Sequence, residues 1–140
     1  MNYEYLDTST ADLTIRAFGK DLKEAFTNSA MAVFNTMVDA GSVSEQEIKL
    51  VSKKAKDIKS LFYDFIEEII YFHDAEGLVF KTVKVEDIDE KNNTLRAVFK
   101  GENFNPKKHK PKNNIKAITY YDMKISHKNS GFEIEFTLDL

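Results

Sequence analysis

The segment from Ile58 to Phe72 constrains the fold most, because its apolar residues recur every three or four positions. The stripe comprises Ile58, Leu61, Phe62, Phe65, Ile66, Ile69, Ile70 and Phe72. A face this wide predicts an amphipathic helix that must be covered by a sheet or by another helix. Gly77 follows at the place where a helix commonly stops. The chain therefore has to build a layered core around this helix.

A first helix is predicted upstream. Asp21 stands three residues before Glu24, like a capping box in which aspartate replaces the usual Ser or Thr. From Leu22 to Met37 apolar residues recur at helical spacing, and the helix is expected to end before Gly41. Two amphipathic helices are thus expected.

The other regular segments alternate apolar and polar residues, which is typical of half-buried strands. Strands are expected at residues 3–6, 12–17, 47–52, 79–85, 95–99, 115–126 and 132–140, with a hairpin turn at 89–93. This order of elements predicts an α+β fold in which two helices pack on one face of a mixed sheet. At 140 residues the chain has the length of one domain, spanning 1–140.

Composition excludes several classes of protein. The chain has no cysteine, which excludes disulfides, thiolate zinc sites and cysteine nucleophiles. Its 20 basic and 23 acidic residues give a net charge of -3. This charge argues against a basic, nucleic-acid-binding surface that covers the whole domain. No phosphate-binding glycine loop, nucleophile elbow or metalloprotease motif is present. Without a long apolar stretch or a leader-like start, we expect a cytoplasmic protein with no membrane partner.

Two carboxylates are placed where they can meet. Asp12 enters the first long strand, and Asp139 is the penultimate residue, beside the terminal carboxylate of Leu140. If these ends adjoin, they form the kind of hard-oxygen cluster that binds Ca²⁺ or Mg²⁺. The alternative is that both acids are solvated residues on the polar faces of their strands. Spacing alone leaves both interpretations open.

A second candidate is the segment from Asn103 to Asn114, which contains both prolines and is expected to be an exposed loop. Lys107, Lys108 and Lys110 are its candidate contacts to RNA or a partner, since lysines attract phosphate in a salt-sensitive way. The alternative is a solvated loop without a ligand. In the following strand, one of the adjacent residues Tyr120 and Tyr121 is expected in the core and the other outside.

Six segments in order carry a resemblance to a known family. The opening YLDTSTADLTIRAFG resembles the signature of the archease family. It is followed by DLKEAFTNSAMAVFNTMVD, SLFYDFIEEIIYFHDAEGLVF, GENFNPKKH, IKAITYYDMKI and TLDL, which resemble further family segments in the same order. Family members usually have histidine where this chain has Ser9 and Tyr121, which removes two imidazoles from the region of the acids.

The resemblance implies an accessory protein and no enzyme. Archeases act with a GTP- and metal-dependent RNA ligase in tRNA splicing, in a chaperone-like way, promoting its guanylylation and multiple turnover. By position, the ligands of a divalent ion (Ca²⁺, Mg²⁺ or Mn²⁺) would be Asp12, Asp139 and an oxygen of Leu140. Lys116 would contact the ligase or a phosphate. Two other readings stay open: an RNA-binding module or RNA chaperone, and a free-standing metal-dependent hydrolase that uses the same acids.

Overall fold

A computed structural model describes residues 1–6 and 9–140 of the chain. Asp7 and Thr8, which belong to the first family-like segment, lie outside the described residues. The elements are β1 (Tyr3–Leu6), β2 (Asp12–Gly19), α1 (Leu22–Met37), η1 (Ala40–Ser42), β3 (Glu47–Lys54), α2 (Ile58–Glu76), β4 (Leu78–Asp89), β5 (Thr94–Asn103), β6 (Ala117–Lys128) and β7 (Gly131–Asp139). The two helices and the order of the strands agree with the sequence prediction. No helix among the described residues is long and apolar enough to cross a membrane.

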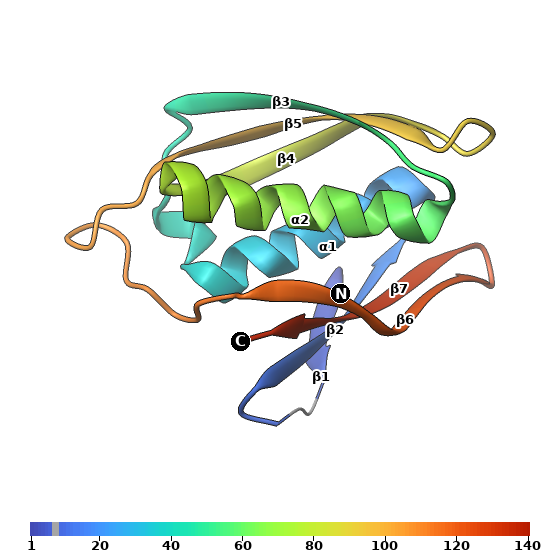
Figure 1. The fold of residues 1–140 in the computed structure, drawn as a ribbon, viewed down its shortest axis with the longest axis horizontal. Helices are drawn as coiled ribbons and strands as arrows, with labels where there is room; N and C mark the ends of the chain where they lie inside the picture. The colour runs from blue at the N-terminus through green and yellow to red at the C-terminus, as the bar shows by residue number, and fades with distance from the viewer. Residues whose placement is uncertain (7–8) are drawn as a thin grey trace.

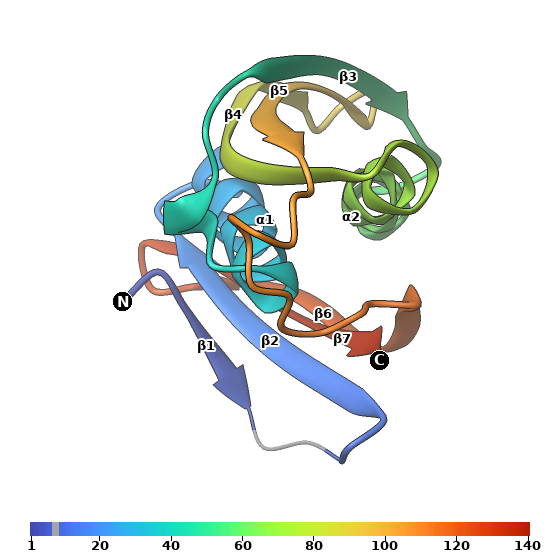
Figure 2. The same cartoon turned by 90° about the vertical axis from the view of Figure 1, so that its left-hand side faces the viewer.

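The strands form two sheets on opposite sides of the helices (Figure 1). One sheet has the order β1-β2-β7-β6 and the other the order β3-β5-β4. Every strand pairing in them is antiparallel. Figure 2 shows the same arrangement end on, with α1 and α2 between the sheets. The α+β class is confirmed, but the expected mixed sheet with helices on one face is corrected to two antiparallel sheets.

The physical reason for this difference lies in the helices. Buried residues occupy most sides of α1, including the small residues Ala25, Ser29, Ala30 and Ala32 between its aromatic ones. A helix buried on several sides needs cover on more than one of them. The two sheets supply that cover from opposite directions.

Each helix is capped by its own sequence. The carboxylate of Asp21 accepts the Glu24 amide at 2.8 Å, and that of Asp57 accepts the Ser60 amide at the same distance. These N-caps satisfy amides that the helix itself leaves without acceptors. Gly77 ends α2 with φ of 67°, a left-handed conformation that favours glycine.

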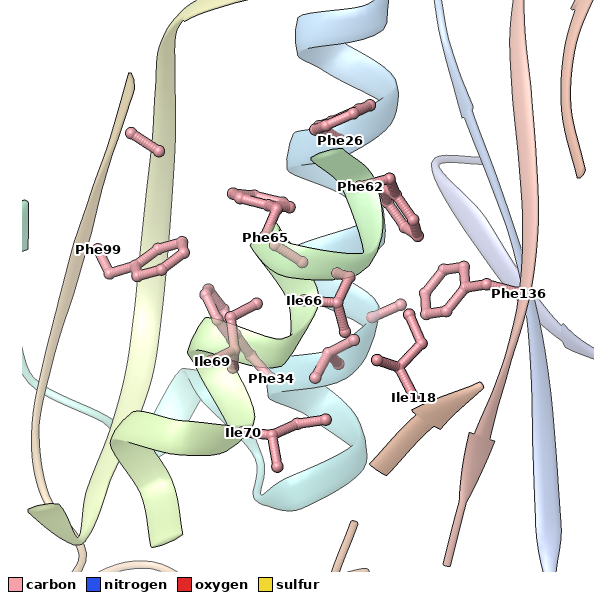
Figure 3. Packing of buried hydrophobic residues seen from close by; sticks show 14 of the residues in the cluster. Phe26, Phe34, Phe62, Phe65, Ile66, Ile69, Ile70, Phe99, Ile118 and Phe136 are labelled. Atoms are coloured by element: carbon pink, nitrogen blue, oxygen red, sulfur yellow. The ribbon is translucent and has the colours of Figure 1, made fainter. Parts of the chain in front are cut away.

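An aromatic cluster joins the layers. Phe65 of α2 has its ring centroid 5.5 Å from that of Phe26 on α1 and 5.7 Å from that of Phe99 on β5. On the opposite side, the ring centroid of Phe62 lies 5.0 Å from that of Phe136 on β7. Figure 3 shows these rings between the helices and the two sheets. The core therefore holds both sheets to one helix pair.

Candidate functional site

Strands β2 and β7 place Asp12 and Asp139 directly opposite each other. The amide of Leu140 donates to the carbonyl of Ala11 at 2.8 Å, so these two residues form the neighbouring hydrogen-bonded pair. Asp12 and Asp139 are then a pair without mutual backbone hydrogen bonds, the arrangement in which opposite side chains approach most closely. The predicted meeting of the two acids is confirmed.

The polar face of this sheet continues from the acid pair. Thr14 and Thr137 share a hydrogen bond of 2.9 Å between their hydroxyls. Arg16 binds Glu135 at 3.0 Å and Glu4 at 2.9 Å. The arginine is thus engaged by acids farther along the strands. No ion pair involves Asp12 or Asp139 within residues 1–6 and 9–140.

The donor set suits a hard cation. Two carboxylates held side by side without a cationic partner repel each other, and a divalent ion between them removes that repulsion. Asp12 is exposed, whereas Asp139 and Leu140 are partly buried. The part of the chain that the structure describes has no cluster of three or more His, Asp or Glu residues that could hold a metal. These two acids and an oxygen of Leu140 are the protein ligands that the family resemblance implies, and water would complete the shell.

Lys116 lies beside the acid pair. Its amide donates to the carbonyl of Asp139 at 2.8 Å, and the next residue, Ala117, is the β6 partner of Asp139. The side chain of Lys116 is exposed. A long flexible cation at this position is within reach of a phosphate or an acidic partner that approaches the site.

A bulge in β6 overturns the expectation for the two adjacent tyrosines. The register with β7 passes from Thr119 directly to Lys124, so the residues between them have no partners on β7. Tyr120 and Tyr121 are both exposed, at 52% and 74%, instead of one lying in the core. Tyr120 stacks on Tyr63 of α2 at 4.2 Å between centroids, with planes 4° apart. Strict alternation fails here because a bulge breaks it.

The segment from Asn103 to Asn114, predicted as an exposed loop with several lysines, is more ordered than its sequence indicates. His109 is completely buried, contrary to the expectation of a wholly exposed loop. Its Nδ1 accepts the amide of Asn105 at 2.9 Å, so the proton is on Nε2, which donates to Glu102 at 2.9 Å. The same carboxylate accepts the Ser44 amide at 2.7 Å. Glu102 therefore fastens the loop to the body of the protein.

Glu102 also binds one of the three candidate lysines. The ammonium of Lys108 lies 2.8 Å from its carboxylate. This contact, followed by the Ser44 amide and the imidazole of His109, lowers the pKa of Glu102 to about 2. Sequence reasoning missed Glu102, because its partners come from residues 44 to 109 and no local pattern connects them. Lys107 and Lys110 are exposed and have no ion pair in the described ranges.

Lys108 binds Glu102, whereas Lys107 and Lys110 have no ion pair in the described ranges, and this difference leads to a prediction for the loop. Replacing both Lys107 and Lys110 by serine should leave thermal stability within about 0.5 kcal/mol of the parent, because both side chains are exposed. The double variant should lose affinity for RNA or for an acidic partner more at low salt than at high salt. Lys108→Ser is the matched control, since it should destabilise the loop by removing a partner of Glu102. Equal affinity at both ionic strengths would contradict a contact role for the two lysines.

Comparison with known proteins identifies the family and agrees with the fold. The model of the Archease protein family matches residues 3–140. Protein archease of Pyrococcus abyssi is 43% identical over 123 residues, covering 87% of each chain. Protein archease of Sulfurisphaera tokodaii is 40% identical over 131 residues, covering 94% of each chain.

A solved structure is similar as well. The solution structure of Methanobacterium thermoautotrophicum protein 1598 superimposes with a TM-score of 0.83 at 31% identity, covering 99% of both chains. Agreement in sequence and in three dimensions thus extends over nearly the full length. This chain belongs to the archease family.

Proposed function

We propose that this protein is an accessory activator of a GTP- and metal-dependent RNA ligase of the tRNA-splicing type. The observation that carries the proposal is the direct pairing of Asp12 with Asp139, the two acids that the family resemblance assigns to a metal ion. Their position at an exposed end of β2 and β7 makes the pair accessible to a partner. The protein alone joins no RNA and hydrolyses no GTP in this proposal.

The residues around the acid pair have distinct tasks. Asp12 and Asp139 would hold a divalent ion together with an oxygen of Leu140, and Lys116 would contact the ligase or a nucleotide phosphate. When bound, the ion would neutralise charge on a triphosphate. The backbone bond from the Lys116 amide to the Asp139 carbonyl fixes the lysine relative to the acids. Together they present charges of both signs to the mouth of the ligase active site.

Activation requires only a modest difference in binding. The protein has to bind the guanylylation-competent state of the ligase more tightly than its resting state. A preference of about 1.4 kcal/mol shifts that equilibrium tenfold. A small docking edge with one ion and one lysine is sufficient for this effect.

Multiple-turnover joining of RNA halves by limiting ligase tests the proposal. With GTP and a divalent ion present, a small amount of this protein should raise both the turnover number and the yield of ligase-GMP. Lys116→Ala should reduce the stimulation without unfolding the protein, because this side chain is exposed. Lys54→Ala, an exposed lysine of the other sheet, is the matched control and should stimulate normally. Unchanged rate and ligase-GMP yield across a range of added protein would refute the accessory role.

A second candidate function is a plain RNA-binding module. The observation in its favour is the pair of exposed lysines, Lys107 and Lys110, on an ordered loop. Salt-dependent binding of RNA by the isolated protein, without any effect on a ligase, would favour it.

A further inference from the structure

The two sheets have four edge strands among the described residues, and they differ in how they are protected. β1 is only four residues long. β6 carries the bulge at Tyr120 and Tyr121. β4 has two register shifts, which leave Lys81 and Glu86 unpaired with β5. Short strands and bulges are the devices by which edges avoid pairing with other chains.

β3 lacks both devices. Its eight residues pair with β5 in one unbroken register from Glu47 to Lys54. The amide of Ala55 donates to the carbonyl of Asn93 at 3.0 Å, which continues this register by one residue. Because antiparallel pairs alternate, the odd-numbered residues of β3 bond to β5. The even-numbered residues, 48, 50, 52 and 54, therefore direct their amides and carbonyls to the open edge.

The side chains of β3 also leave that edge unguarded. Lysines often protect an edge strand, but Lys49 binds Glu76 of α2 at 2.7 Å and Lys53 binds Glu68 of α2 at 2.8 Å. The third lysine, Lys54, is exposed at the last position of the strand and leaves its centre unguarded. The outward face instead carries Ile48, which is 59% exposed, and Leu50, which is 79% exposed. An open edge thus coincides with two exposed apolar side chains.

We propose that a second copy of this chain pairs with β3 in antiparallel orientation, about a two-fold axis at Leu50. In this register Leu50 meets Leu50 of the second copy on the outward face, and Ile48 packs beside them. On the inward face Glu47 lies opposite Lys53 of the second copy, because the two residues are equally distant from Leu50. The ammonium of Lys53, which binds Glu68 of its own α2, then lies between two carboxylates. The strand is therefore complementary to itself in charge and in apolar contacts, which an isologous interface requires. The two β3-β5-β4 sheets become one continuous sheet.

Single cysteines test the register, since the chain contains no cysteine of its own. In this pairing the two copies of Leu50→Cys have Cα atoms about 5.5 Å apart, within the range of a disulfide. The two copies of Ser52→Cys lie about 13 Å apart, which is too far. Mild oxidation should therefore give a covalent dimer with Leu50→Cys and only monomer with Ser52→Cys. Equal cross-linking of both variants, or of neither, would overturn the proposed register.

Sedimentation over a concentration series tests the interface without cross-links. The parent protein should shift from monomer to dimer as its concentration rises, and Leu50→Lys should remain monomeric at every concentration. Tyr121→Lys is the matched control, because it puts the same charge on an exposed residue of the bulged edge and should dimerise like the parent. Circular dichroism establishes that both variants are folded. A parent that stays monomeric throughout overturns the proposal and leaves the β3 edge to a strand of a different protein.

Discussion

Replacing Asp12 or Asp139 by asparagine is expected to weaken divalent-ion binding by about tenfold or more, because each change removes one of the two paired carboxylates that we propose as ligands. Stimulation of the ligase should be lost in parallel. The fold should persist, since asparagine keeps the shape of the side chain and removes the repulsion between two like charges on facing strands.

Calorimetric titration with Ca²⁺, Mg²⁺ and Mn²⁺ measures this effect. Asp87→Asn is the control, because Asp87 is an exposed acid of the other sheet, opposite Arg96. It should bind ions and stimulate the ligase like the parent. If Asp12→Asn and Asp139→Asn both bind ions as well as the parent does, Asp12 and Asp139 are not the ligands, and this result is independent of any effect of the protein on a ligase.

Truncating the central aromatic residue should have the largest effect on stability. Phe65 is fully buried between Phe26 and Phe99, so Phe65→Ala removes contacts with α1 and with β5 at once. A buried phenylalanine replaced by alanine typically costs about 3–5 kcal/mol of unfolding free energy. Urea denaturation of the parent and the variant measures the difference.

Tyr121→Ala is the control for this experiment. It also truncates an aromatic side chain, but one that is 74% exposed, and should change the free energy of unfolding by no more than about 0.5 kcal/mol. Similar losses in the two variants would mean that the aromatic cluster does not hold the sheets together.

Periodicity in the sequence predicted the elements of the fold well, and their arrangement less well. The stripe of α2, the caps at Asp21 and Gly77, and the hairpin of β4 and β5 are local patterns. The division of the strands into two sheets depends on which strands pair, and alternation reveals only the two faces of a strand. For that reason the sequence favoured one sheet where the chain builds two.

The candidate site was predictable for a different reason. Asp12 begins β2 and Asp139 ends β7, so the antiparallel pairing of these two strands is enough to bring the acids together. Glu102 was missed because three separate segments converge on it. The exposure of both Tyr120 and Tyr121 was missed because a bulge gives no pattern that distinguishes it from a regular strand.

The pairing of β2 with β7 has a consequence for the time course of folding. The hydroxyl contact between Thr14 and Thr137 spans 123 positions, whereas α1, β3, α2, β4 and β5 all lie within residues 22–103. Contacts between distant parts of a chain form slowly, since a long loop must close first. During synthesis on the ribosome β2 emerges before β7, so the two strands cannot pair until the elements between them have been made. We therefore expect the acid pair to be among the last features of the molecule to form.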